Sequence, residues 1–539
     1  MRFLVFLTVI FLIHNIAVLG NSKRHSIIPI PVSMSYLPGE CIITNSFKVG
    51  LFPLDVDTNK LAHIFCENMP SSLNVQIQTI DSQLLLQDEA VSVNICINKN
   101  NRFPSEGYEL IVSSGEISIN ASTSVGAFWA IQTLQQLMEK HVSHVRIPCV
   151  KILDYPRFAY RGLHLDVARH MFSVEFIKKY IDLMSKYKLN KFHWHLTDDQ
   201  GWRIEIKKYP RLQEIAAYRN ATLVGHLKKK HQVFDQKRYG GYYTQEEIKE
   251  IVQYASDRKV TIIPEIDLPG HALSVLAAYP HLGCEEKNYQ TGTKWGIFDD
   301  VFCAGNDEVF TFLENVLDEV LALFPSKLIH IGGDEVLSTK WKSCSKCQSR
   351  VQSENLGNES KLQDYFMNKL VSYLKSKNRK AVGWDEILNN DLNPEVLIMS
   401  WRGESGGILA ANTNRYAIMT PSKELYFDKY QSTNSTEPLA IGGLLPLKRV
   451  YLYDPIPDNL DEKKRKYILG AQANVWTEYM KSESAVEYMA FPRALALSEV
   501  VWSQKSQRDY TGFINRLIDH FPELNKMNIN YRCLEQSDF

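Results

Sequence analysis

Carboxylate, histidine and tryptophan side chains recur in this chain at the ends of short apolar segments. The densest example is His330-Ile-Gly-Gly-Asp334-Glu335, where two acidic residues follow an apolar segment and two glycines. Successive strand residues point to opposite faces, so adjacent carboxylates cannot flank a bond as nucleophile and acid. Where the strand ends and the chain turns, both can reach one pocket from the same side. That geometry suits a reaction in which the substrate supplies the nucleophile, one carboxylate orients it and the other is the general acid.

Similar groups follow the other apolar segments. They are Asp166 and Arg169; His193, His195, Asp198 and Asp199; Glu265, Asp267 and His271; Trp384, Asp385 and Glu386; Trp401 and Arg402; Tyr426 and Asp428; and Trp476 and Glu478. Carboxyl groups are the acids and bases of glycosidic bond cleavage, and the acid needs a raised pKa. Tryptophan rings can wall a sugar and exclude water. The collection therefore predicts a carbohydrate hydrolase.

Eight short apolar segments must position these groups, and helical stretches separate them. The segments are 162–167, 191–196, 260–266, 328–331, 381–384, 396–401, 416–419 and 467–472. Eight strand–helix alternations predict a (β/α)8 TIM barrel, over residues 156–505, with catalytic groups at the carboxyl ends of its strands. The helices after the fifth and sixth segments are less clearly marked than the others.

The regions outside the barrel have different patterns. Alternating residues at 91–97, 108–112 and 117–119, and a helix over 127–139, predict a small α+β support domain across 21–155. Residues 506–539 are expected to form a partly helical tail that packs on the barrel. Residues 1–20 have the basic start, apolar run and small final residue of a signal peptide, and the run is shorter than a membrane span. We expect no membrane anchorage after its removal.

Charge and glycosylation motifs narrow the class further. The 539 residues include 61 basic and 61 acidic side chains, for a net charge of zero. Nucleic acids and anionic membranes select a basic excess, so neither is expected as the main partner. Four Asn-x-Ser/Thr sequons, at Asn120, Asn220, Asn358 and Asn434, fit a secretory route to the lysosome or to the exterior.

The nine cysteines all follow the expected signal peptide, and their odd number leaves at least one outside any intrachain disulfide. Cys344-Ser-Lys-Cys347 has the spacing of half a zinc site. No second Cys or His pair lies nearby in sequence at ligand spacing. A structural disulfide that involves Cys303 is therefore favoured, and no metal or cofactor is expected.

Six blocks in order resemble those of glycoside hydrolase family 20, the β-N-acetylhexosaminidases. They are Arg161-Gly-Leu-His-Leu-Asp-Val-Ala-Arg-His170, Phe192-His-Trp-His-Leu-Thr-Asp-Asp199, Pro264-Glu-Ile-Asp-Leu-Pro-Gly-His271, His330-Ile-Gly-Gly-Asp-Glu335, Gly383-Trp-Asp-Glu386 and Val475-Trp-Thr-Glu478. The resemblance covers nearly the whole mature chain. It implies an exo-acting enzyme that releases terminal N-acetylglucosamine or N-acetylgalactosamine from glycans or chitooligosaccharides, with retention and without a cofactor. Members of the family often dimerise, so a homodimer is among the expectations.

The resemblance also implies residue roles. Glu335 would be the general acid and then the base, while Asp334 would orient the acetamido N–H and stabilise an oxazolinium-like intermediate. Asp198, or Asp199 in its place, would form a supporting relay with His271. The residues that would bind the sugar are Arg161, Trp384, Trp401, Tyr426, Asp428, Trp476 and Glu478, with the three tryptophans as a cage.

Two other classes compete with this interpretation. A metal-dependent amidohydrolase barrel would use His193-Trp-His195 as a metal pair, but no histidine follows His330 until His520, beyond the barrel strands. A non-catalytic N-acetylhexosamine-binding lectin would require the loss of Asp334 or Glu335, and both are present.

Overall fold

The structure is a computed structural model that describes residues 26–539 apart from 45, 54, 68, 80–91, 100–102 and 390. The signal peptide expected over residues 1–20 lies outside the described residues. Across the described ranges, no helix has the length and apolar character that a membrane crossing requires.

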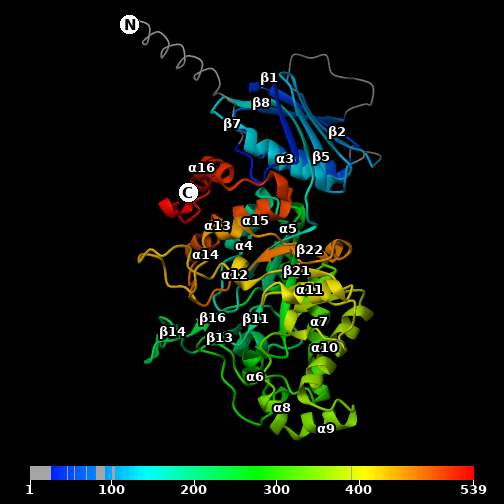
Figure 1. The fold of residues 1–539 in the computed structure, drawn as a ribbon, viewed down its shortest axis with the longest axis vertical. Helices are drawn as coiled ribbons and strands as arrows, with labels where there is room; N and C mark the ends of the chain where they lie inside the picture. The colour runs from blue at the N-terminus through cyan, green and yellow to red at the C-terminus, as the bar shows by residue number, and fades with distance from the viewer. Residues whose placement is uncertain are drawn as a thin grey trace, which may run out of the picture.

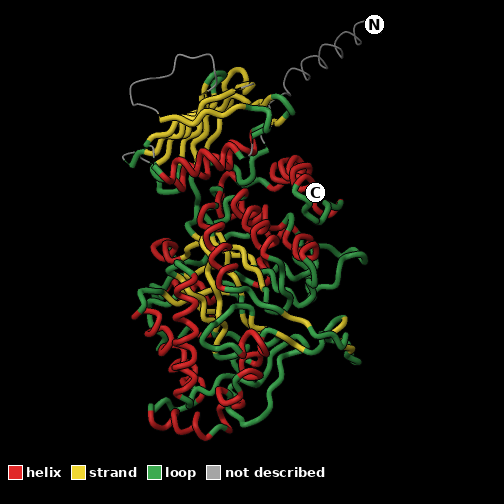
Figure 2. Tube along the Cα trace, turned by 180° about the vertical axis from the view of Figure 1, so that it is seen from behind, coloured by secondary structure: helices red, strands yellow, loops and turns green. Residues whose placement is uncertain are grey.

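A small domain with a mixed sheet precedes the barrel. Its strands are β1 (Ser33–Thr44), β2 (Ser46–Phe52), β3 (Asn74–Thr79), β4 (Ser92–Ile97), β5 (Tyr108–Val112), β6 (Glu116–Ala121), β7 (Glu139–Lys140) and β8 (His144–Asp154). They lie in the order β1-β8-β5-β6-β4-β2-β3, with β7 on β8. Helices α2 (Val56–Cys66) and α3 (Ser124–Leu137) lie on one face, between the sheet and the barrel (Figure 2). The small α+β domain expected from sequence is confirmed.

Eight parallel strands close into the predicted barrel. The barrel and its helices form the larger body below the small domain (Figure 1). They are β9 (Tyr160–Asp166), β10 (Lys191–His195), β17 (Thr261–Leu268), β18 (Leu328–Gly332), β19 (Lys380–Trp384), β20 (Leu397–Ser400), β21 (Ala417–Met419) and β22 (Ile468–Ala473). Each coincides with one of the eight apolar segments, and β22 pairs with β9 to complete the ring. The barrel therefore follows from the sequence pattern strand by strand.

Helices of unequal length cover the barrel. The long ones are α4 (Val174–Lys186), α5 (Gln245–Asp257), α7 (Asp307–Leu323), α10 (Glu359–Ser376) and α15 (Arg493–Trp502). Helix α5 begins at a capping box, where Thr244 and Glu247 bond each other's backbone N–H at 2.7 and 3.2 Å. Strand β19 leads only to the short η3 (Asp385–Ile387), and β20 leads to the eight-residue α11 (Ser405–Asn412). The weak helix signals after the fifth and sixth strands thus have a structural cause.

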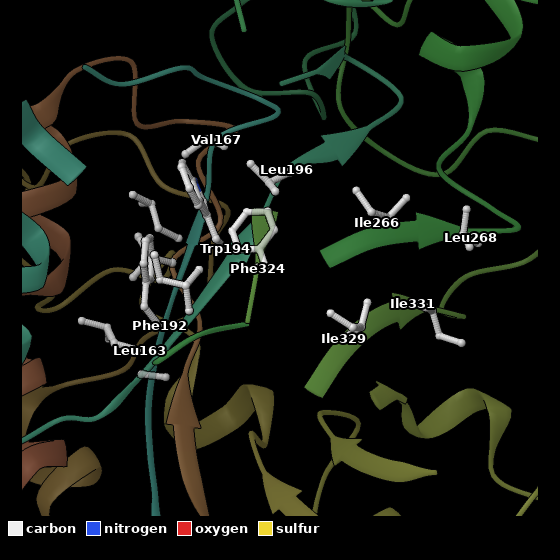
Figure 3. Packing of buried hydrophobic residues seen from close by; sticks show 14 of the residues in the cluster. Leu163, Val167, Phe192, Trp194, Leu196, Ile266, Leu268, Phe324, Ile329 and Ile331 are labelled. Atoms are coloured by element: carbon white, nitrogen blue, oxygen red, sulfur yellow. The ribbon is translucent and has the colours of Figure 1, made fainter. Parts of the chain in front are cut away.

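Side chains along each barrel strand alternate between the apolar layer outside the barrel and the polar interior. Outward-facing residues such as Phe192, Trp194 and Ile329 belong to the apolar layer between strands and helices (Figure 3). The residues between them, including His193 and His330, face the interior and are fully buried. Because side chains alternate along a strand, the same short segment builds both the core and the floor of a polar site.

Asp154 joins the small domain to the barrel. Its carboxylate accepts hydrogen bonds from Tyr108 (2.6 Å), Trp502 (3.0 Å) and Lys188 (2.8 Å), and all four side chains are buried. The C-terminal helix α16 (Tyr510–Lys526) packs on the barrel as well, where Phe513 stacks on Tyr451 with ring centres 4.7 Å apart. These contacts are at the amino-terminal side of the barrel, so the carboxyl ends of the strands stay free for a site.

Candidate active site

A small cavity lies at the carboxyl ends of the barrel strands. Its volume is about 130 Å³, far below the roughly 300–1,000 Å³ of pockets for drug-sized ligands. The cavity therefore fits one terminal sugar residue rather than several. It is lined by Arg169, Asp198, His271, Asp334, Glu335, Trp384, Trp401, Tyr426, Asp428, Trp476 and Glu478. Every site residue expected from sequence is in this set except Arg161.

The turn after β18 brings both acidic residues to one side. Gly332 and Gly333 have φ values of 64° and 97°, and Glu335 itself has a φ of 50°. A side chain at Gly332 would overlap a carboxylate oxygen of Asp267. The glycines thus allow a left-handed turn that ends the strand alternation. As a result Asp334 and Glu335 both border the cavity, as the sequence predicts.

His271 connects the acid pair to a second pair of aspartates. Its Nδ1 lies 3.2 Å from Asp198 and 3.1 Å from Asp199, and its Nε2 lies 3.5 Å from Glu335 and 3.7 Å from Asp334. Burial disfavours the charged ring, but the surrounding carboxylates outweigh it and hold the pKa of His271 well above its usual value. The two relay candidates left open by the sequence both contact the histidine.

Asp334 is the more enclosed member of the pair. Its side chain is 13% exposed, against 33% for Glu335. Burial, reinforced by the charge of Glu265, raises the pKa of Asp334 to about 6, although His271 acts in the opposite direction. Among the described residues, its Oδ1 atom has no hydrogen-bond partner. A buried polar atom without a partner is rare in native proteins, so this oxygen is available to a ligand in the cavity.

Glu265 organises the floor beneath the cavity. Its carboxylate lies 3.1 Å from His193 and 2.8 Å from His330, and it accepts hydrogen bonds from the indole of Trp384 (2.9 Å) and from His195. Burial opposes its ionisation, but the three histidines hold the pKa of Glu265 well below its usual value. The sequence places Glu265 at a strand end but indicates no role for it. Its position between strands β10 and β18 becomes visible only in the closed barrel.

Aromatic rings wall the cavity. Trp384 and Trp476 have ring centres 6.0 Å apart, and Tyr426 stacks against Trp401 at 6.0 Å. The Trp401 indole donates to both carboxylate oxygens of Glu386, at 3.0 and 2.8 Å, which fixes the ring plane. The three tryptophans expected to form a cage do surround one space.

Two more carboxyl groups complete the rim. Burial, reinforced by the charge of Glu478, raises the pKa of Asp428 to about 7. Burial also raises the pKa of Glu478, although the charge of Arg169 acts in the opposite direction. Asp428 Oδ1 and Glu478 Oε2 have no hydrogen-bond partner among the described residues. Such atoms can accept from sugar hydroxyls, because a bound hydroxyl supplies the missing donor.

Arg161 is not in the cavity, which corrects the expectation from sequence. It lies at the amino-terminal end of β9, fully buried, where it pairs with Glu106 of the small domain at 2.6 Å and lies over the Trp502 ring at 4.9 Å. Arg169, eight residues later, lines the cavity instead and contacts Asp198 at 2.7 Å. Arg161 and Arg169 lie at opposite ends of β9, with the length of the strand between them. Only Arg169, which follows the carboxyl end, can reach a ligand in the cavity.

The two arginines make a matched pair for mutation. We expect Arg161→Gln to lower the free energy of unfolding by about 3 kcal/mol, because it leaves the mostly enclosed carboxylate of Glu106 without its charged partner, and to leave KM unchanged. We expect Arg169→Gln to lower kcat/KM by about tenfold or more through lost charged hydrogen bonds. Chemical denaturation and steady-state kinetics on an aryl glycoside measure both. A raised KM with unaltered stability in Arg161→Gln would restore the original assignment.

An acid pair, tryptophan walls and a one-sugar cavity at the strand ends of a TIM barrel define a glycoside hydrolase site. Two family models match the chain: "Glycosyl hydrolase family 20, catalytic domain" over residues 158–505 and "Glycosyl hydrolase family 20, domain 2" over residues 24–155. The chain belongs to glycosyl hydrolase family 20.

The chain is similar to two beta-hexosaminidases in sequence and to a family 20 enzyme of known structure in fold. A beta-hexosaminidase of Porphyromonas gingivalis is 42% identical over 94% of this chain, which spans 64% of that protein's length. A beta-hexosaminidase of Vibrio furnissii is 34% identical over 88% of this chain and 80% of its own. The structure of a family 20 exo beta-N-acetylglucosaminidase from Vibrio harveyi, in complex with N-acetylglucosamine, is 31% identical with a TM-score of 0.83, covering 94% of this chain and 78% of that one.

Proposed function

We propose that this protein is an exo-β-N-acetylhexosaminidase that releases terminal, non-reducing N-acetylglucosamine or N-acetylgalactosamine with retention of configuration. The observation that carries the proposal is the placement of Asp334 and Glu335 on one side of a one-sugar cavity. A nucleophile and an acid would have to lie on opposite sides of the scissile bond. Two carboxylates on the same side leave the nucleophile to the substrate.

The reaction then runs in two steps. The acetamido oxygen of the substrate attacks the anomeric carbon, the bond to the leaving oxygen breaks, and Glu335 gives that oxygen its proton. Asp334 accepts the acetamido N–H through its unpartnered oxygen and balances the positive charge that develops on the ring. Water next attacks the anomeric carbon, Glu335 takes its proton, and the acetamido group is restored. Tyr426, in the cavity wall, holds the acetamido oxygen in line.

The decisive test compares two substrates that differ only at the 2-position. We expect an aryl N-acetyl-β-glucosaminide to be cleaved and the matching aryl β-glucoside to be cleaved at least about 10⁵-fold more slowly, since intramolecular attack has a large effective molarity. Release of the phenol measures both rates. Cleavage of the two substrates at similar rates would contradict substrate assistance.

The competing classes fit the site less well. The His193 and His195 rings that an amidohydrolase would give to a metal do not line the cavity, and they lie against Glu265 and Asp198. Those contacts account for both histidines as supports of the floor and of the relay. A lectin would have no use for a carboxylate pair with an ionisable relay behind it.

Asp428 predicts discrimination against sulfated sugars. The resemblance to family 20 implies that Asp428 and Glu478 bind the 4- and 6-hydroxyls of the sugar, and both residues line the cavity. A 6-sulfate would therefore place like charges together. We expect the 6-sulfated aryl substrate to be turned over at least about tenfold more slowly than the plain one above pH 7. Since the pKa of Asp428 is about 7, its carboxyl is neutral at pH 5 and the difference should shrink there. Equal turnover of both substrates at pH 8 would contradict a role for Asp428 in excluding 6-sulfated sugars.

We infer that the protein follows the secretory route, to the lysosome or to the exterior. The N-terminal segment has signal-peptide character, and three of the four sequon asparagines, Asn220, Asn358 and Asn434, are exposed. Enzymatic removal of N-glycans from the native protein should lower its mass. An unchanged mass, together with an intact N-terminus, would contradict secretion.

A further inference from the structure

Four cysteines gather beside the active-site face although they are far apart in sequence. Cys284 follows η2 (Pro280–Leu282), and Cys303 precedes α7, both in the segment after β17. Cys344 and Cys347 lie at the junction of α8 (Thr339–Ser343) and α9 (Ser345–Ser353), in the segment after β18. Helices α8 and α9 are at the end of the molecule opposite the small domain (Figure 1).

The distances between the sulfur atoms identify the kind of cluster. Cys303 lies 3.6 Å from Cys347 and 3.7 Å from Cys344, and Cys284 lies 3.8 Å from Cys347. All four sulfurs lie within 4.8 Å of one another. A disulfide would bring two sulfurs to about 2.0 Å. A tetrahedron of thiolates about 2.3 Å from a central zinc ion has edges of about 3.8 Å.

The surroundings of the four cysteines favour ionised thiol groups held close together. Cys344 is the N-cap of α9 and Cys347 lies in its first turn, where the helix dipole favours negative charge. Cys303 and Cys347 are fully buried and Cys344 is 7% exposed. Gly305 allows the close approach, since a Cβ there would overlap the backbone of Lys346 and Cys347. An indole bond from Trp341 to the Phe302 carbonyl, at 2.9 Å, ties the same two segments together.

We propose that Cys284, Cys303, Cys344 and Cys347 hold a structural zinc ion. The ion fastens the segment that follows His271 to the segment that follows Glu335, and so helps to fix the relay against the acid pair. This inference does not depend on the proposed substrate. The sequence pattern disfavoured zinc because the second pair of ligands is far from the first along the chain. Cys303 precedes Cys344 by 41 residues, and Cys284 precedes Cys347 by 63.

The first test measures metal in the full-length protein. After expression with zinc in the medium and gel filtration, we expect about one zinc ion per chain by elemental analysis. Cys344→Ser and Cys347→Ser should lose the ion and unfold at a lower temperature. Cys533→Ser is the matched control, because Cys533 is exposed and outside the cluster, and it should keep both. Wild-type protein without zinc would overturn the proposal.

A second test uses only wild-type protein, so its result does not depend on whether the variants fold. Protein produced with cobalt in place of zinc should show the visible absorption of cobalt in a tetrahedral thiolate site. Alkylation of the denatured, metal-stripped protein without a reductant should modify all four cysteines. Two disulfides among them, or bound iron instead of zinc, would overturn the assignment.

Discussion

Glu335→Gln should lower kcat/KM by about 10²–10⁴-fold on substrates with a poor leaving group, because the departing oxygen then receives no proton. The loss should shrink on an aryl glycoside with a strongly acidic phenol, which leaves without protonation. Steady-state kinetics on a series of aryl N-acetyl-β-glucosaminides measure this dependence.

The control for this variant is Glu462→Gln, which removes a carboxylate from an exposed position on η4 (Glu462–Tyr467). It should leave the whole series unchanged. An equal loss in Glu335→Gln for good and poor leaving groups would show that Glu335 has a role other than proton donation.

Asp334→Asn should lower kcat by about 10²–10³-fold, since it removes the charge that balances the developing oxazolinium. The wild-type pH profile should carry the signature of this residue. With the pKa of Asp334 raised to about 6, the carboxylate is protonated as the pH falls through 6, so kcat/KM falls on the acid side well above the usual range of an aspartate. The Asp334→Asn profile should lack this acid limb. A limb that persists would assign it to another group of the cluster.

The unfolding temperature of Asp334→Asn distinguishes the loss of a catalytic group from a general destabilisation of the fold. A carboxyl whose pKa is higher in the folded than in the unfolded state binds more protons when folded, so its contribution to stability falls as the pH rises from about 4 to about 6. At pH 7 the charged Asp334 therefore disfavours folding, and Asp334→Asn should unfold at the same or a higher temperature. Asp458→Asn, at an almost fully exposed site, should alter neither activity nor stability. A lower unfolding temperature in Asp334→Asn would point to a structural role.

Most of the fold could be predicted because the signals are local. The eight barrel strands are short apolar segments bounded by polar residues, and the clearest helices have apolar stripes and caps. The helices after the fifth and sixth strands were poorly marked for a local reason as well. Elements η3 and α11 are too short to show an apolar stripe along one helix face. The site was predictable for a related reason: parallel strands in a barrel end on one face, so groups that follow each strand must converge.

What the sequence by itself determined is the set of groups that meet at that face, including the adjacent acid pair, from which we predict that an N-acetylated substrate supplies the nucleophile. The tertiary structure decided everything that depends on which distant residues become neighbours. It placed Arg161 against the small domain and Arg169 in the cavity, put Glu265 among three histidines, and joined Cys284 and Cys303 to Cys344 and Cys347. Periodicity records which face of its own element a residue occupies, whereas contacts between loops are set by chain closure and packing across dozens of residues. For that reason the acid pair could be found from its own six residues, and the cysteine cluster could not.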